Sequence, residues 1–214
     1  MSPDPAHRLI RDITWRRRNN QHAVLGIQGP PGSGKSTLGL GISLSIPDTP
    51  FGIENIHYNR DDWHNIVTAE KGQVFLLDEG NNVASNRTWQ DREQVGLMQI
   101  LNMIRQRNHV LVWATPSLKR LDVVVREDLL THRINCIPGA WRARVRQPSW
   151  DRDGEPSGWR TWKGYLSWPQ LDTHPIWKPY SEAKERNYLM KAAEIYNKNA
   201  NTEAISPIGI MTDK

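Results

Sequence analysis

Cysteine is almost absent from this chain of 214 residues, which contains only Cys136. One thiol cannot build a disulfide framework or a cysteine-rich metal site, so we expect a protein of a reducing, cytoplasmic setting. A secretory signal is not expected either, because the chain starts with Met1-Ser2-Pro3-Asp4. No apolar run in the sequence approaches the about 18 residues that a membrane-spanning helix needs, so we expect no membrane span.

Phenylalanine is also scarce, with 2 copies against 10 tryptophans, most of which lie between Trp141 and Trp177. Hydrophobic residues make up 37% and charged residues 24% of the chain, which is typical of a soluble globular protein. The formal net charge of +5 permits a polyanionic partner but does not require one. The length accommodates one α/β domain of ordinary size with a small appendage.

A phosphate-binding motif stands in the first fifth of the chain. Residues 29–37 read GPPGSGKST, which is G-x-x-x-x-G-K-S followed by threonine. The glycines let backbone N–H groups approach phosphates without an obstructing Cβ, and Lys35 reaches the β- and γ-phosphates. A buried strand is predicted over 23–27 and a helix over 36–45, whose N-terminal dipole favours an anion. We therefore predict an ATP site formed by Gly29, Pro30, Pro31, Gly32, Ser33, Gly34, Lys35, Ser36 and Thr37.

A second motif follows about 40 residues later, where the apolar run Val74–Leu77 is followed by Asp78 and Glu79. Consecutive apolar residues are typical of a strand that is buried on both faces of a parallel sheet. Ligands of such sheets bind at the carboxyl ends of the strands. We therefore predict that Ser36 and Asp78 hold Mg²⁺, Asp78 through water. Glu79 is predicted to polarise the attacking water as the general base.

The predicted fold is an α/β P-loop NTPase with a central, mainly parallel sheet of five strands flanked by helices. Residues 80–91 are interpreted as an active-site loop. Thr115 directly follows the fourth predicted strand at its tip, and we expect its hydroxyl to sense the γ-phosphate or the lytic water. The predicted strands are 23–27, 56–58, 73–77, 110–114 and 133–137, and helices are expected over 5–22, 61–69 and 90–107.

Arg105 and Arg107 lie at the end of the helix predicted over 90–107. In the structural interpretation they complement the carbonyl groups at the helix terminus, which favour cations. In the functional interpretation one of them reaches the γ-phosphate of a neighbouring subunit in a ring. The sequence leaves both interpretations open, and we carry both arginines forward as candidate catalytic residues.

The motifs together resemble a known group of enzymes. Residues 76–82 read LLDEGNN, and residues 97–122 read LMQILNMIRQRNHVLVWATPSLKRLD. The order of motifs resembles the additional-strand, catalytic-glutamate division of P-loop NTPases. Within this division, residues 23–137 are similar to zonula occludens toxin-like phage ATPases and to viral genome-packaging ATPases related to FtsK–HerA translocases. The resemblance implies a homo-oligomeric ring that hydrolyses ATP and acts on DNA, with a virion or portal protein as a further partner.

The segment after the predicted core alternates in character. Arg142, Arg144 and Arg146 share one side of a predicted strand, and Trp141, Ala143 and Val145 share the other. A second strand is predicted over 159–168, adding Arg160 and Lys163 to the basic face of a β-hairpin. Either the arginines are solvated and the tryptophans cover the sheet edge, or the hairpin contacts DNA.

A last helix is predicted to begin at Ser181 as its N-cap and to end near Asn197. The predicted divisions are an ATPase core with its N-terminal helix over 1–138, a hairpin and helix over 139–198, and a flexible tail over 199–214.

The favoured function is an ATP-hydrolysing motor that translocates or packages DNA, of a virus or mobile element, in the cytoplasm of its host cell. The alternative is an AAA-type ATPase that loads or remodels a protein complex, with the hairpin as an adaptor surface. A nucleotide-gated switch is disfavoured because a switch does not need Glu79 as a strong base. A small-molecule kinase is disfavoured because no lid with a set of phosphate-binding arginines is evident.

Overall fold

The computed structural model describes residues 4–58, 63–78, 103–121, 123, 125–168 and 170–203. Glu79, the predicted loop 80–91 and most of the predicted helix 90–107 lie outside the described residues, as does the tail from residue 204. The chain divides into two compact units, residues 1–173 and 174–214. The predicted division after residue 138 falls within the first unit.

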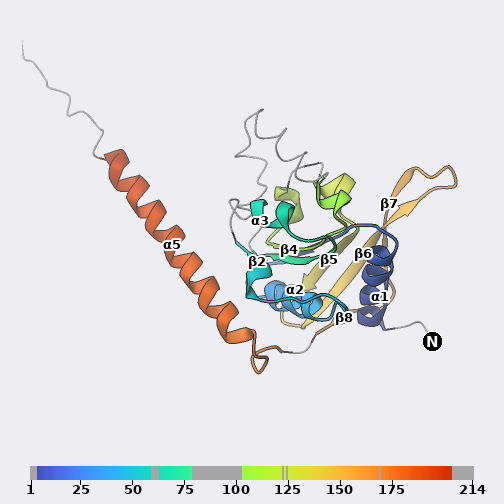
Figure 1. Cartoon of the computed structure of the whole chain (residues 1–214), viewed down its shortest axis with the longest axis horizontal. Coiled ribbons are helices and arrows are strands. Elements are labelled where there is room, and N and C mark those ends of the chain that lie inside the picture. Colours follow the sequence, from blue (N-terminus) through green and yellow to red (C-terminus); the bar gives the residue numbers. More distant parts are fainter. Residues whose placement is uncertain are drawn as a thin grey trace, which may run out of the picture. The chain divides into compact units, whose positions relative to one another are not determined.

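Five parallel strands form the centre of the first unit, in the order β2-β3-β4-β1-β5 (Figure 1). Their bounds are β1 Ala23–Gln28, β2 Ile56–His57, β3 Val74–Leu77, β4 Val110–Thr115 and β5 His132–Ile137. β4 lies between β1 and β3, so an additional strand separates the strand before the phosphate loop from the strand before Asp78. The predicted five-stranded α/β sheet is confirmed.

Helices cover both faces of this sheet. On one face lie α1 (Pro5–Arg18) and α2 (Lys35–Leu44), and α2 approaches closely at Gly39, where a Cβ would be 2.8 Å from the Leu76 side chain. The other face packs against α3 (Trp63–Thr68), η4 (Leu118–Arg120) and η5 (Val125–Leu129). Its apolar cluster includes Val24, Ile66, Phe75, Leu77, Leu111, Trp113, Leu118, Val125 and Leu129. Burial of both faces accounts for the continuous apolar strands of the sequence.

The predicted hairpin is present and continues the same sheet. β6 (Arg142–Trp150) pairs antiparallel with β5 and with β7 (Pro156–Thr161), while β8 (Leu166–Ser167) pairs with the start of β6. The single strand predicted over 159–168 is wrong, because the chain turns after β7 at Gly164, which has a φ of +84°. Arg160 lies opposite Gln147, whereas Thr161 lies opposite Arg146. Arg160 is therefore on the other face from Arg142, Arg144 and Arg146, contrary to the prediction.

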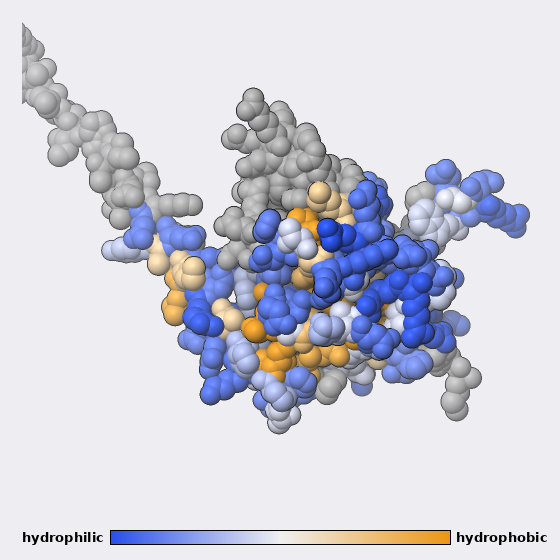
Figure 2. Space-filling model, viewed as in Figure 1, coloured by the Kyte–Doolittle hydropathy of each residue, from blue (hydrophilic) through white to orange (hydrophobic). Residues whose placement is uncertain are grey.

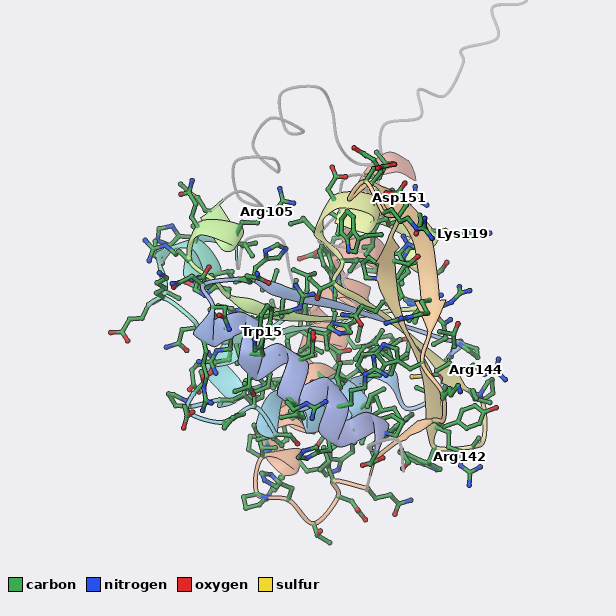
Figure 3. The ribbon with its side chains drawn as sticks, turned by 90° about the vertical axis from the view of Figure 1, so that its right-hand side faces the viewer. Trp15, Arg105, Lys119, Arg142, Arg144 and Asp151 are labelled. Atoms are coloured by element: carbon green, nitrogen blue, oxygen red, sulfur yellow. The ribbon has the colours of Figure 1, made fainter. Side chains whose placement is uncertain are left out.

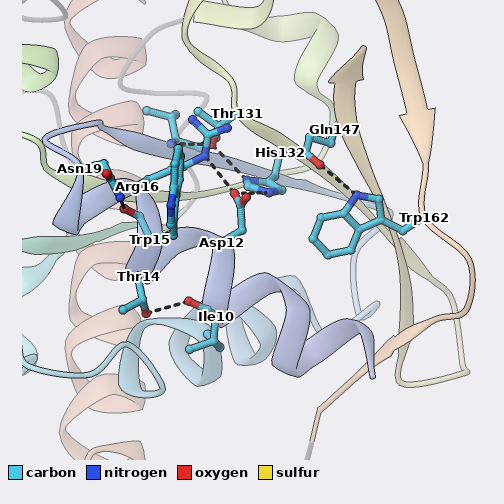
Figure 4. Close-up of polar contacts among 11 residues, drawn as sticks. Ile10, Asp12, Thr14, Trp15, Arg16, Asn19, Thr131, His132, Gln147 and Trp162 are labelled. Carbon is cyan, nitrogen blue, oxygen red and sulfur yellow. Dashed lines mark hydrogen bonds and ion pairs between the residues drawn. The ribbon is translucent and has the colours of Figure 1, made fainter. Parts of the chain in front are cut away.

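A partly buried polar contact joins α1 to β5 (Figure 4). The Asp12 carboxylate accepts a hydrogen bond from Arg16 Nε at 2.9 Å and lies 3.3 Å from His132 Nε2. Partial burial of Asp12 acts to raise its pKa, but the hydrogen bonds and charges of His132 and Arg16 outweigh it and lower this pKa to about 2. Burial lowers the pKa of His132, although Asp12 acts in the opposite direction. The contact fixes α1 beside the strand that borders the hairpin.

The second unit consists of α5 (Trp177–Glu203) and the residues around it. The predicted start at Ser181 is wrong, because Ser181 lies inside the helix and donates to the Lys178 carbonyl at 3.0 Å. Before the helix, the Ile176 N–H donates to His174 Nδ1 at 3.2 Å. Within the described part of the chain, none of the helices combines the length and apolar character that crossing a membrane requires.

Candidate nucleotide-binding site

The phosphate loop joins the carboxyl end of β1 to the N-terminus of α2, as predicted. Gly34 precedes α2 with φ +78°, a conformation that glycine adopts without a steric penalty. At Gly29 a Cβ would lie 2.7 Å from Ser33 Oγ and 3.1 Å from Cys136 Cβ, so a side chain there would collide with the loop. The loop therefore requires glycine for its backbone path and for its close packing.

The structure brings together the side chains predicted to act on the phosphates and the metal ion. Lys35 Nζ donates to the Pro30 carbonyl within the loop at 2.7 Å. Ser36 Oγ donates to Asp78 Oδ1 at 2.7 Å, and Asp78 is buried at the end of β3. A hydroxyl and a carboxylate are hard oxygen ligands of the kind that Mg²⁺ takes together with nucleotide phosphates. The donor set therefore fits Mg²⁺, which would neutralise phosphate charge when bound.

A polar network that the sequence analysis did not identify supports the loop from the neighbouring strands. Gln28, the last residue of β1, donates from Nε2 to Asn135 Oδ1 at 2.6 Å and accepts from the Leu118 N–H at 2.9 Å. The Gln28 side chain thus connects β1, β5 and η4 directly before Gly29. The sequence did contain a signal for this network, because Gln28 is a polar residue at the end of an apolar strand, directly before the motif.

Thr115 lies at the same edge of the sheet, since it pairs with Gln28 across the β1–β4 ladder. Its side chain is buried, and Oγ1 lies 3.3 Å from the Ser117 carbonyl oxygen, to which it donates. The residue is therefore at the tip of the strand between β1 and β3, where the sequence analysis placed it. Its sensing role stays a prediction.

Arg105 and Arg107 lie at the opposite edge, because they precede β4 rather than follow it. Arg105 donates to the Asp128 carbonyl at 2.9 Å and Arg107 to the Ala69 carbonyl at 2.7 Å. Both side chains are exposed, and Figure 3 shows Arg105 on the far side of the first unit from Arg142 and Arg144. Within one chain, these arginines are therefore not brought to the phosphate loop. Glu79 follows Asp78 directly and lies outside the described residues.

The strand order, the phosphate loop and the Ser36–Asp78 contact define a P-loop NTPase. A family model described as Novel STAND NTPase 3 matches residues 13–119, which is half of the chain. The chain belongs to this family. The match confirms the predicted enzyme class, a nucleotide-binding P-loop NTPase.

The chain is also similar to several solved structures. The N-terminal domain of zonular occludens toxin from Neisseria meningitidis is 18% identical with a TM-score of 0.47, over 71% of this chain and 96% of that one. The Holliday junction branch migration motor RuvB from Thermotoga maritima is 21% identical with a TM-score of 0.37, over 56% of this chain. The match spans 41% of RuvB, well under two thirds of its length. No curated protein matches the sequence.

Proposed function

We propose that this NTPase is a ring-forming, ATP-driven motor that translocates or packages DNA in the cytoplasm of its host cell. The observation that carries the proposal is a row of exposed arginines, Arg142, Arg144 and Arg146, on one face of β6. The row starts beside the phosphate loop, because Arg142 pairs with Ile137 at the carboxyl end of β5. In Figure 3, the Arg142 and Arg144 side chains extend away from the strand.

The contacts of the row support binding to a polyanion. Arg144 donates to the Tyr165 hydroxyl at 3.0 Å, and Arg146 donates to Thr161 Oγ1 at 3.3 Å. Among the described residues, none of the three arginines forms an ion pair with a carboxylate. Their charges are therefore not neutralised within the described part of the chain. The projecting end of the β6–β7 hairpin is hydrophilic (Figure 2), but it carries Asp151, Asp153 and Glu155, so the proposed contact with a polyanion is limited to the arginine row.

The row is long enough to contact several phosphates of a nucleic-acid backbone. Alternate residues of a strand are about 6.6 Å apart, so three arginines span about 13 Å. That is the axial length of about four base pairs of duplex DNA. A motor has to hold every sequence that it passes, so its contacts should go to phosphates rather than to base edges.

Oligomerisation is part of the same proposal. Arg105 and Arg107 are exposed but lie at the edge of the sheet opposite the phosphate loop, so either could act only on the nucleotide of another subunit. An arginine supplied in trans accelerates phosphoryl transfer by about 10³–10⁵ in well-characterised systems.

The helix α5 offers a surface for contact with a second chain. Its exposed large side chains are Tyr188, Leu189, Met190 and Tyr196. A virion or portal protein is the further partner that the resemblance implies.

Replacing Arg142, Arg144 and Arg146 together with alanine should weaken DNA binding for all sequences alike. Each lost phosphate contact should reduce the salt slope of binding by about one unit, because fewer counterions are released. Fluorescence anisotropy titrations at several salt concentrations measure this slope. The matched control replaces Arg11, Arg18 and Arg160, which removes the same charge from exposed sites outside the row. Equal slopes for wild type and the β6 variant would favour the alternative, an ATPase that remodels protein complexes.

A further inference from the structure

Two tryptophans from the C-terminal part of the first unit border the phosphate loop. Trp168 follows β8, and Trp141 lies in the turn between β5 and β6. A Cβ on Gly34 would be 3.1 Å from the Trp168 ring and 3.4 Å from the Trp141 ring. Gly34 directly precedes Lys35, so the aromatic pair lies beside the residues that bind phosphate.

Trp141 has an unusual backbone conformation for a large side chain. Its φ is +46°, in the left-handed region that bulky residues rarely adopt. The side chain is 44% exposed, so burial of the ring does not compensate for this strain. Residues held in such sparsely populated conformations cluster at active sites and ligand-binding sites. The conformation therefore points to a function of the Trp141 ring.

Trp168 supplies a polar group at the same place. The side chain is only 9% exposed, and its Nε1–H has no hydrogen-bond partner among the described residues. This nitrogen lies 3.5 Å from the position of a Cβ on Gly34. A buried indole N–H usually finds a partner, so a donor that borders the loop without one is suited to a ligand atom.

The two rings are held against each other. Their centroids are 6.1 Å apart and their planes meet at 64°, an edge-to-face arrangement that is favourable for aromatic pairs. The more buried Trp168 thus supports the more exposed Trp141. An exposed aromatic ring supported in this way offers a rigid stacking surface at low entropic cost.

We propose that Trp141 and Trp168 form the subsite for the base of the bound nucleotide. A triphosphate that is cradled by the loop leaves its ribose and base outside the loop, where this aromatic pair stands. Trp141 stacks on the purine ring, and Trp168 Nε1–H donates to an oxygen of the same nucleotide. The inference rests on nucleotide binding at the phosphate loop and adds the residues that hold the other end of the ligand.

The test compares two ligands that share the phosphates and differ in the base. Calorimetry measures binding of a non-hydrolysable ATP analogue and of inorganic tripolyphosphate, each with Mg²⁺, to the full chain. Trp141→Ala should weaken binding of the ATP analogue by about 5–150-fold, the range expected for loss of one stacked base, and leave tripolyphosphate binding unchanged. Trp141→Phe should retain most of the affinity. Trp150→Ala is the matched control, because Trp150 is 62% exposed at the other end of β6.

The outcomes separate the subsite from the nucleotide site itself. Equal losses for both ligands would mean that Trp141 only maintains the loop, and no loss for either would place the base elsewhere; both results overturn the inference. If the wild-type protein binds neither ligand, nucleotide binding at the loop is excluded, and the subsite that rests on it is excluded as well. Trp168→Phe removes the hydrogen-bond donor but keeps an aromatic ring. This variant should bind the ATP analogue more weakly and bind tripolyphosphate with unchanged affinity.

Discussion

Replacing Lys35 with alanine is expected to reduce ATP turnover by about 10²–10³-fold, the usual cost of removing one donor that stabilises transition-state charge. ATP affinity should fall as well, because a charged hydrogen bond to phosphate is lost. The present contact of Lys35 Nζ is with the Pro30 carbonyl inside the loop. This contact orients the side chain along the loop, where phosphate would lie.

Steady-state phosphate release and a titration with a fluorescent ATP analogue measure the two effects of Lys35→Ala. Lys71→Ala is the matched control, because its exposed ammonium group contacts Asn20 at 3.2 Å, away from the loop. Turnover in the Lys35→Ala protein that equals the Lys71→Ala value would exclude this loop as the site of hydrolysis. Circular dichroism of both variants establishes that they are folded.

Replacing Glu79 with glutamine is expected to preserve ATP binding and to reduce hydrolysis by about 10²-fold or more. The amide keeps the shape of the side chain but cannot take a proton from the attacking water. Asp78, the preceding residue, is held by Ser36 at 2.7 Å, so the metal-binding pair is left intact in this variant.

The separation of binding from hydrolysis distinguishes Glu79 from its neighbours. Asp78→Asn should weaken Mg²⁺-dependent ATP binding, whereas Glu79→Gln should not, and the exposed Glu70→Gln should change neither quantity. Single-turnover experiments measure the rate of hydrolysis, and equilibrium titrations measure the affinity for ATP. Near-normal hydrolysis by the Glu79→Gln protein would remove Glu79 from the role of general base.

The phosphate loop and the central sheet could be predicted from the sequence because their signals are local. Residues 29–37 carry the whole motif, and the apolar run before Asp78 marks a strand buried on both faces. The Ser36–Asp78 contact follows from these two motifs, since both are placed at the carboxyl ends of parallel strands.

Contacts that depend on strand order and on register could not be predicted. Gln28 meets Asn135 because β5 lies next to β1, which spacing along the chain does not reveal. Arg160 is on the opposite face from Arg146 because the β6–β7 ladder pairs Arg146 with Thr161, and a shift of one residue would reverse this. The sequence identified the tryptophan-rich segment, but only the fold brings Trp141 and Trp168 to Gly34.

The proposed coupling of ATP turnover to DNA is tested by the steady-state ATPase rate as double-stranded DNA is added. Turnover should rise with DNA concentration and saturate, and raising the salt should shift the curve to higher DNA concentrations. The Lys35→Ala protein supplies the blank. An ATPase rate that depends on Lys35 but is unchanged at every DNA concentration would contradict this coupling and leave a P-loop ATPase with another partner.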